Sequence, residues 1–499
     1  MDHGSHYREM TRNAHIEATA FGPRFGKLIR AYRDDLGLSA RDLAERVWDD
    51  SGRKASISRL ENGHVLRPEA KTVQAIAHAL DIPPEEIDAL RLADAVPLPA
   101  LTADLESLAR HSRDQLEALA NRFEIDRAFE RSESELRKLL EWKAEEYRAY
   151  RGSLDRAGGL SAIDSETNKL MKDAAASMDF EALDHHLARL DRTHSDQAIV
   201  IKEKRAAHAL LRGRVKKAYL IFTSAAQTMH SSDALEMARL RNEYHKLLYD
   251  HGLRYPGEGL RLAIKMQRPA VAAVANEDHS SDWARYLQNL ANALANFGAR
   301  GQGARGITSI TEAIDAYAIV SQHLTRQEDP EGWGMVQHNQ GAALYLLSTK
   351  TDDPMRRSES LTEAVQTFRK ALEVRQRDIA PKLWAMTLQN LAVALKELGQ
   401  VTSGSNGRKL IDEALTSLKD SLLVRTYDAN AMEWAMTQEN IALAEYALAG
   451  HVCAADAQNH YAAALEHIHS ALKVYAPKSA PFYFEKATNL RRTLDNLLR

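Results

Sequence analysis

Cysteine is almost missing from this 499-residue sequence, which contains only Cys453. A single cysteine excludes an internal disulfide framework and any zinc site built from several thiolates, and it is typical of a reducing compartment. Long apolar runs are missing as well, since no stretch of eighteen or more uncharged apolar residues occurs, and no segment is predicted to span a membrane. We therefore expect a cytoplasmic protein with no membrane partner.

Aromatic residues make up only 6% of the chain, and neither sign of charge dominates, because 66 Lys and Arg face 69 Asp and Glu. Balanced charge gives no global nucleic-acid signature, so DNA binding requires a local basic patch. Strand-like alternation is also lacking, whereas apolar residues recur almost everywhere at helical spacing. The sequence predicts an all-α protein, and its length predicts more than one domain.

Motifs that carry catalysis are not found. The glycine-rich segment 298–306 lacks the Lys-Ser/Thr of a phosphate-binding loop and follows a helical pattern, not a strand. The pair His185 and His186 lacks metal-ligand spacing, and Cys453 has no histidine pattern that indicates a nucleophile. We therefore expect no enzyme, with no catalytic residues, no metal and no cofactor.

The N-terminal part contains the pattern of several short helices. Residues 24–36 place apolar side chains on one face, Gly37 suits a helix end, and Ser39 is an N-cap candidate three residues before Asp42. In "RKASISRLENG" (53–63), Ile57 and Leu60 face the core. The opposite side of that helix then carries Lys54, Ala55, Ser58 and Arg59.

Three segments carry a family resemblance: "LSARDLAERV" (38–47), "SISRLENG" (56–63) and "TVQAIAHALDI" (72–82). They resemble the Cro/repressor-type (XRE) helix-turn-helix, which implies a five-helix domain that binds double-stranded DNA. The resemblance places Lys54, Ala55 and Arg59 at base-contacting positions, and Ser56 and Asn62 at phosphate-contacting positions. With the neighbouring basic residues, the predicted DNA-binding set is Arg53, Lys54, Ala55, Ser56, Ser58, Arg59, Asn62 and Arg67.

The turn "VWDDSGRKA" (47–55) departs from that family, because it is about three residues longer and carries two aspartates. The extra length shifts the recognition helix or adds a contact beside it. The alternative is a helix-turn-helix fold that has lost DNA binding and mediates protein contacts. A second basic segment, 202–217, has seven basic residues against one acidic residue. It is predicted to be a solvated helix face, with DNA or an acidic partner as the alternative.

A repeat with a period of about fifty residues fills the C-terminal half. Tryptophans begin four copies of one amphipathic helix, at Trp283, Trp333, Trp384 and Trp434. An asparagine follows each tryptophan after six residues, and degenerate copies add one more at either end. These asparagines are Asn242, Asn289, Asn339, Asn390, Asn440 and Asn489.

A fixed period of this size is typical of a helical solenoid. The pattern resembles tetratricopeptide repeats of the kinesin-light-chain-like kind, although those repeats are shorter. Segments such as 298–309 and 399–410 predict that the extra residues lengthen the turn between the two helices of each repeat. The tryptophans are predicted to pack between helices. The asparagines either line a groove that holds a peptide or protein ligand, or hydrogen-bond the neighbouring helix.

We divide the chain into an N-terminal tail (1–20), a helix-turn-helix domain (21–95), a helical connector (96–160) and an α-solenoid (161–499). The connector is a candidate for homodimerisation, the alternative being a hairpin that caps the repeats. This arrangement looks like the peptide-sensing RRNPP regulators. It implies a sequence-specific transcriptional regulator whose solenoid senses a peptide, protein or small ligand. The alternative is a scaffold or adaptor, in a defence or signalling operon, whose helix-turn-helix serves only autoregulation or protein contacts.

Overall fold

A computed structural model describes residues 21–62, 64–65, 68–83, 87, 112–125, 128–155, 165–193, 198–228, 234–275, 281–477 and 480–499. Within these ranges every regular element is a helix, as the sequence predicted. The predicted tail (1–20) and Arg67 lie outside the described residues. None of the helices in the described ranges is long and apolar enough to cross a membrane.

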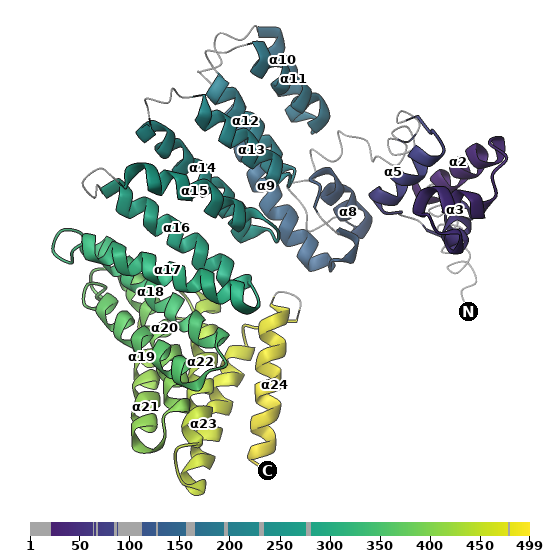
Figure 1. Cartoon of the computed structure of the whole chain (residues 1–499). Helices are drawn as coiled ribbons and strands as arrows, with labels where there is room; N and C mark the ends of the chain where they lie inside the picture. Colours follow the sequence, from purple (N-terminus) through teal and green to yellow (C-terminus); the bar gives the residue numbers. More distant parts are fainter. Residues whose placement is uncertain are drawn as a thin grey trace. The chain divides into compact units, whose positions relative to one another are not determined.

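The helices follow one another along the chain in the order shown by the colours of Figure 1. In the N-terminal part they are α2 (Phe21–Asp35), α3 (Ala40–Trp48), the 3-10 helix η1 (Ser51–Arg53), α4 (Lys54–Glu61), α5 (Ala70–Ala79) and α8 (Arg113–Arg122). The next part contains the 3-10 helix η3 (Ala128–Glu130), α9 (Glu133–Asp155), α10 (Ser165–Ala176), α11 (Phe180–Thr193), α12 (Ala198–Leu211) and α13 (Val215–Gln227).

The C-terminal part is a series of long helices that alternate in direction. They are α14 (Ala234–Arg254), α15 (Gly259–Val274), α16 (Ser281–Arg300), α17 (Gly303–His323), α18 (Pro330–Lys350), α19 (Pro354–Leu372), α20 (Pro381–Val401), α21 (Gly404–Ser421), α22 (Ala431–Ala449), α23 (Ala454–Leu472) and α24 (Pro481–Leu497).

Internal contacts divide the chain into two units, residues 1–122 with 176–178, and residues 123–175 with 179–499. The boundary falls inside the predicted connector, so that α8 belongs to the first unit and α9 to the second. In the first unit, α2 to α5 enclose a core that includes Phe25, Ile29, Leu43, Ile57 and Ile76. The predicted fifth helix of this domain falls largely on residues that the structure does not describe.

In the second unit, successive helices from α14 onward form antiparallel hairpins that stack side by side (Figure 1). We call α14, α16, α18, α20, α22 and α24 the A helices, and α15, α17, α19, α21 and α23 the B helices. Each A helix from α14 to α20 contacts the next A helix directly, whereas the B helices from α15 to α23 contact mainly A helices. Because the A layer is the more closely spaced one, it forms the inner side of the stack.

The predicted packing of the tryptophans is confirmed for two of them, since Trp283 is buried in one core and Trp434 packs against another. In α20, Leu388, Leu391, Leu395 and Leu398 are buried along the stripe that begins at Trp384. Three of these leucines join α18, α19, α21 and α22 in one core. Burying such a stripe contributes roughly 1.5–3 kcal/mol per leucine, which is the main force that stacks one hairpin on the next.

The predicted long turn between the helices of each repeat is wrong. Only two residues separate α16 from α17, and again α20 from α21, and these four helices contain 20, 21, 21 and 18 residues. The extra residues of the fifty-residue period therefore lengthen the helices. Gly303 (φ +64°) and Gly404 (φ +71°) follow the two turns in left-handed conformation, which a glycine adopts without steric cost.

Pairs of small residues allow these hairpins to close so tightly. A Cβ at Gly298 would lie 2.7 Å from the carbonyl oxygen of Gly306, and one at Gly399 would lie 2.8 Å from that of Gly407. Both distances are below van der Waals contact, so the helices cross at glycine because no side chain fits between them. Glycine in this segment, read from the sequence as a loop signal, is instead a helix-crossing signal.

We expect the substitution Gly399→Ala to destabilise the solenoid by about 1–3 kcal/mol, because the new methyl group overpacks against Ile411 and Gly407. The thermal unfolding midpoint measured by circular dichroism should fall. Gly450→Ala is the matched control, since its Cβ would meet nothing closer than 3.4 Å. Equal midpoints for the two variants would contradict the tight crossing.

Candidate nucleic-acid interface and solenoid groove

The recognition helix α4 follows a short, locally determined turn. Ser39 and Asp42 form the predicted capping box at the start of α3, and Gly37 takes a left-handed φ of 64°. The long turn after α3 is compact, because Asp49 adopts a left-handed conformation and the Asp50 side chain accepts a hydrogen bond from Gly52 N at 2.9 Å. The additional residues thus form the 3-10 helix η1, which leads directly into α4.

An ion pair between the half-buried Arg33 and the buried Glu61 fixes α4 against α2. Arg33 donates to both carboxylate oxygens of Glu61, at 2.5 and 3.2 Å, and to the carbonyl of Leu38 at 2.6 Å. The hydrogen bond to Glu61 raises the pKa of Arg33, so the guanidinium keeps its charge. Gly26 permits the close approach, since a Cβ there would collide with the carbonyl of Leu60.

The opposite side of α4 is open to solvent, as the spacing of Ile57 and Leu60 predicted. These two side chains are buried, whereas Lys54, Ala55, Ser56 and Arg59 are exposed and Ser58 is half-buried. Neither Lys54 nor Arg59 forms an ion pair with a described residue. Two cations are therefore presented on one face of a rigidly held helix, which is the arrangement that phosphate or base contacts require.

The two residues that flank α4 are partly engaged within the unit. The guanidinium of Arg53 lies 5.5 Å from the ring centre of Trp48, and its Nε lies 3.7 Å from a carboxylate oxygen of Asp50. Asn62 is exposed, and its Oδ1 accepts a 2.7 Å hydrogen bond from Arg30. Because a guanidinium can only donate, this bond uses Asn62 Oδ1 and leaves the Nδ2 donor for another acceptor, such as a phosphate oxygen.

In the solenoid, the first asparagines of the repeat link one A helix to the next. Asn242 is fully buried, so it lies too deep to contact a ligand itself. Its Oδ1 accepts hydrogen bonds from Gln267 Nε2 at 3.0 Å and from Asn289 Nδ2 at 2.9 Å. Gln267 Nε2 also donates to the carbonyl of Tyr286, which identifies that atom as the nitrogen and thereby fixes both asparagine amides.

The next two asparagines, Asn339 and Asn390, are half-buried and continue the series of links. Asn339 Nδ2 lies 3.1 Å from Asn292 Oδ1, on the preceding A helix. Asn390 Nδ2 lies 3.3 Å from Nε2 of His338. Asn440 is half-buried without a side-chain hydrogen bond to a described residue, and the exposed Asn489 accepts from Arg492 at 3.2 Å.

The hydrogen bonds of the buried Thr387 hydroxyl determine the tautomer of His338. The Thr387 hydroxyl donates to the carbonyl of Leu383 at 2.8 Å and accepts from Arg375 at 3.0 Å. Its single proton is thus used, so His338 Nδ1, 3.1 Å away, must be the donor in that pair. His338 Nε2 is then an acceptor for Asn390. Burial and, to a smaller extent, the Arg375 charge together lower the pKa of His338 to about 4.

Comparison with known proteins supports the N-terminal assignment. Residues 29–87 match the model of a helix-turn-helix family. The N-terminal unit contains a helix-turn-helix domain. No curated protein matches the chain.

Solved structures that match the chain include the apo form of the quorum sensor NprR from B. thuringiensis (17% identity, 77% of this chain and 97% of that chain, TM-score 0.28). A Rap protein complexed with competence and sporulation factor is 13% identical over 80% of this chain and 98% of that chain, with a TM-score of 0.27. A circular tandem repeat protein with novel repeat topology is 16% identical over 96% and 97%, with a TM-score of 0.23.

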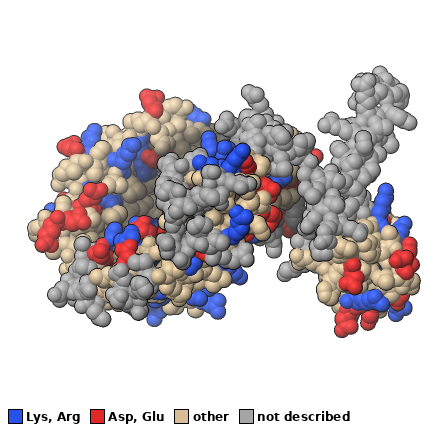
Figure 2. Space-filling view, turned by 90° about the horizontal axis from the view of Figure 1, so that it is seen from above, with Lys and Arg blue, Asp and Glu red and all other residues tan. Residues whose placement is uncertain are grey.

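Outside the helix-turn-helix domain, the basic segment 202–217 is largely neutralised by the second unit itself. Arg205 pairs with Asp191, and Arg212 with Glu124 and Glu181. Lys217 lies 2.6 Å from Asp184. On the face drawn in Figure 2, acidic and basic side chains lie interspersed over the larger unit. The segment thus stabilises the packing of α11 to α13, which neither sequence-based alternative had specified.

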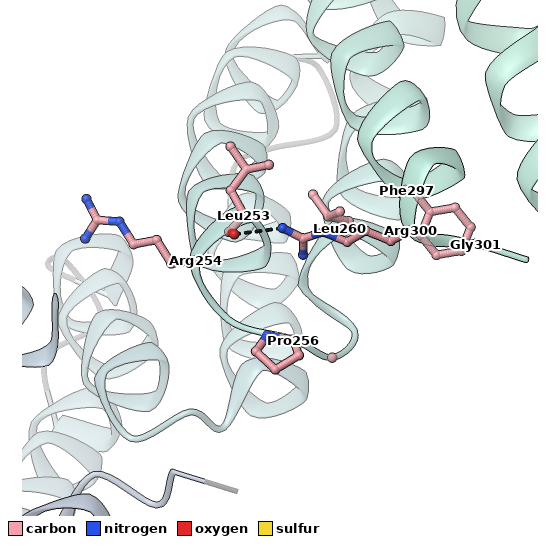
Figure 3. Close-up of a pocket in the computed structure, with 8 residues that line it drawn as sticks. Leu253, Arg254, Pro256, Leu260, Phe297, Arg300 and Gly301 are labelled. Carbon is pink, nitrogen blue, oxygen red and sulfur yellow. Dashed lines mark hydrogen bonds between the residues drawn. The ribbon is translucent and has the colours of Figure 1, made fainter. Parts of the chain in front are cut away.

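A cavity of about 470 Å³ opens where α14 ends and α15 begins (Figure 3). It is lined by Leu253, Arg254, Pro256, Gly257, Leu260, Phe297, Arg300 and Gly301. Arg300 donates to the carbonyls of Gly252 and Leu253 at the C-terminus of α14, the latter at 2.7 Å. Arg254 lies 3.5 Å from Glu146 and points away from Arg300 in Figure 3. Both cations are already bonded to other groups of the chain, and we assign the cavity no function.

Sequence reasoning missed the residues that orient the asparagines. His338, Thr387 and Arg375 are far apart in the chain, and no local pattern relates them. One signal exists: the residue directly before each repeat asparagine is polar in four copies, as Gln288, His338, Gln389 and Glu439. All four side chains are buried, which is unusual for such residues and indicates a polar contact between repeats.

We expect His338→Gln to remove part of the acid sensitivity of the fold. The folded-state pKa of His338, about 4, lies below the ordinary 6.5, so the unfolded chain binds the proton first and stability falls as the pH drops through this window. The loss approaches roughly 1.4 kcal/mol per pH unit. Glutamine occupies the same repeat position at Gln389, where it accepts from Arg425.

The measurement is the unfolding midpoint of the wild type and the variant between pH 8 and pH 4.5. The wild type should lose stability more steeply below pH 6.5 than His338→Gln. The exposed His469 gives the matched control, His469→Gln, whose profile should follow the wild type. Parallel profiles for wild type and His338→Gln would show that His338 is not buried in its neutral form.

Proposed function

We propose that this protein is a sequence-specific regulator that binds double-stranded DNA through α4 and the residues around it. The exposed cationic face of α4 carries this proposal, because Lys54 and Arg59 are held outward by the buried Ile57 and Leu60 and lack intramolecular ion pairs with described residues. A helix of this kind enters the major groove with its N-terminal residues toward the bases. The match of residues 29–87 to a helix-turn-helix family supports the same function.

The solenoid is proposed to sense a ligand, which is a peptide, a protein or a small molecule. Support comes from its inner A layer, where the half-buried Asn289, Asn339, Asn390 and Asn440 reach solvent at the same repeat position. An operator read by a helix-turn-helix generally has two half-sites, so we also propose that the protein binds it as a homodimer. Sedimentation equilibrium at micromolar concentration tests the dimer, and a monomer there would exclude it.

The adaptor alternative makes a different prediction for the genome. A regulator should occupy many sites in a chromatin footprint, and ligand should change that occupancy. An adaptor that only controls its own gene should occupy one site at its own promoter. This experiment also separates DNA binding from a helix-turn-helix used for protein contacts, which would leave no footprint.

We expect Arg59→Ala to lower both affinity and sequence preference, by roughly 1–3 kcal/mol if the guanidinium contacts a base. The measurement is fluorescence anisotropy with an operator selected from random duplexes and with a scrambled duplex. Arg356→Ala, which removes an exposed guanidinium from α19, is the matched control and should change neither value. Binding of all three proteins should weaken as salt increases, because phosphate contacts release counterions.

Two results would contradict this proposal. An unchanged ratio of operator to scrambled affinity in Arg59→Ala would refute base reading by this residue. Salt-independent affinity, or no selection of any duplex, would refute DNA binding by the chain.

A further inference from the structure

The long turn between α3 and α4 ends in an arginine that is both stacked and ion-paired. The guanidinium carbon of Arg53 lies 5.5 Å from the ring centre of Trp48, and its Nε lies 3.7 Å from Oδ2 of Asp50. Stacking on an indole ring and pairing with a carboxylate both restrict the conformations of an arginine side chain. The turn therefore holds one cation in place directly before the recognition helix.

The two partners of Arg53 are themselves fixed by the fold. Trp48 is half-buried and packs against the core of the domain. Asp50 is the N-cap of η1, where its Oδ1 accepts the hydrogen bond from Gly52 N, and its Oδ2 is the atom nearest to Arg53. One carboxylate thus closes the turn and pairs with the arginine at the same time.

The terminal amino groups of Arg53 remain available to a ligand. The side chain is 58% exposed, and neither Nη1 nor Nη2 hydrogen-bonds a residue within the described ranges. The two ends of an arginine fork can donate in parallel to a pair of acceptors. Arg53 also lies at the N-terminal end of α4, which is the end that a helix-turn-helix directs toward the bases.

The charge around Arg53 discriminates between two kinds of acceptor on DNA. Asp49 and Asp50 are both exposed, so two carboxylates accompany the one guanidinium within residues 48–53. A phosphate would be repelled by the same carboxylates that hold the arginine. The major-groove edge of guanine is uncharged, and its O6 and N7 form a pair of acceptors that matches an arginine fork. Guanine is therefore the acceptor that suits this arrangement.

We propose that Arg53 reads a guanine of the operator in the major groove, and that Asp50 and Trp48 are positioning residues that hold its guanidinium for this contact. The inference rests on the proposed DNA binding by α4 and specifies one base that is recognised. It also assigns a role to the long turn. The turn adds a base-reading side chain, and its carboxylates lower the affinity for DNA of other sequences by repelling phosphates.

The substitution Arg53→Ala tests which base is read. The full-length wild type and the variant are each used to select operators from random duplexes, and their base preferences are compared position by position. The variant should lose the preference for guanine at one position, by roughly 5- to 100-fold. Arg59→Ala should alter a different position and leave that guanine selected.

A modified base tests the contact chemically. Replacing the selected guanine by 7-deazaguanine removes the N7 acceptor and keeps the base pair. Wild-type affinity, measured by fluorescence anisotropy, should fall roughly 5-fold or more, whereas Arg53→Ala should bind both duplexes equally. A phosphate contact gives the opposite pattern. The modified base then has no effect on the wild type, and Arg53→Ala reduces the slope of log affinity against log salt by about one.

The substitution Asp50→Asn separates the ion pair from the cap. Asparagine is as good an N-cap as aspartate, so the turn is retained while the charge beside Arg53 is lost. The preference for guanine at that position should fall roughly 2- to 5-fold, and a scrambled duplex should bind more tightly because one carboxylate no longer repels it. Asp35→Asn, which removes an exposed carboxylate from the end of α2, is the charge-matched control and should leave the preference unchanged.

Three results would overturn the inference: an unchanged guanine preference in Arg53→Ala, equal losses on 7-deazaguanine in both proteins, or a parallel loss of operator and scrambled affinity in Asp50→Asn. Circular dichroism confirms that each variant is folded. Failure of the proposed function is a different outcome. A wild type that selects no duplex refutes DNA binding, whereas an unchanged preference in Arg53→Ala with an intact effect of Arg59→Ala removes only this contact.

Discussion

A helical hairpin cannot bury its apolar face by itself, and the second unit depends on satisfying this constraint by stacking. Leucines such as Leu391 and Leu395 are buried only because neighbouring hairpins cover them. The helices within a hairpin approach closely at Gly298 and Gly306, and again at Gly399 and Gly407. Close stacking brings successive A helices into direct contact, so polar groups between them must find partners there.

These partners form a buried polar contact between successive repeats, and the contact recurs at three interfaces with different side chains. In one repeat interface, Thr387 bonds both His338 and Arg375. In the next interface, Gln389 meets Thr437 and Arg425, and in the following one Glu439 meets Tyr475 and Lys486. Buried polar groups can all be hydrogen-bonded in only a few arrangements of the helices. We therefore infer that each of these contacts fixes the register of its repeat against the next. In the first of these contacts, the same bonds orient Asn390.

In the helix-turn-helix domain, an ion pair has the corresponding role of positioning one helix against another. The bidentate contact of Arg33 with the buried Glu61 satisfies both charges and ties the end of α4 to α2. Removing one partner of such a pair destabilises the fold more than the intact pair stabilises it. The main effect of the pair is therefore to fix the position of α4. The consequence is a recognition helix whose remaining cations, Lys54 and Arg59, are held in position and left open to solvent.

The sequence by itself determined the helices, the N-cap at Ser39, the inward side of α4 and the period of the array, because these depend on local spacing and propensity. The sequence-based prediction that the extra residues of each repeat lie in the turns was wrong. The turns contain only two residues, and so short a turn depends on how closely the two helices can cross. Only the tertiary structure decided the direction of the asparagine amides. Their partners lie 47 to 52 residues away, beyond the reach of any local pattern.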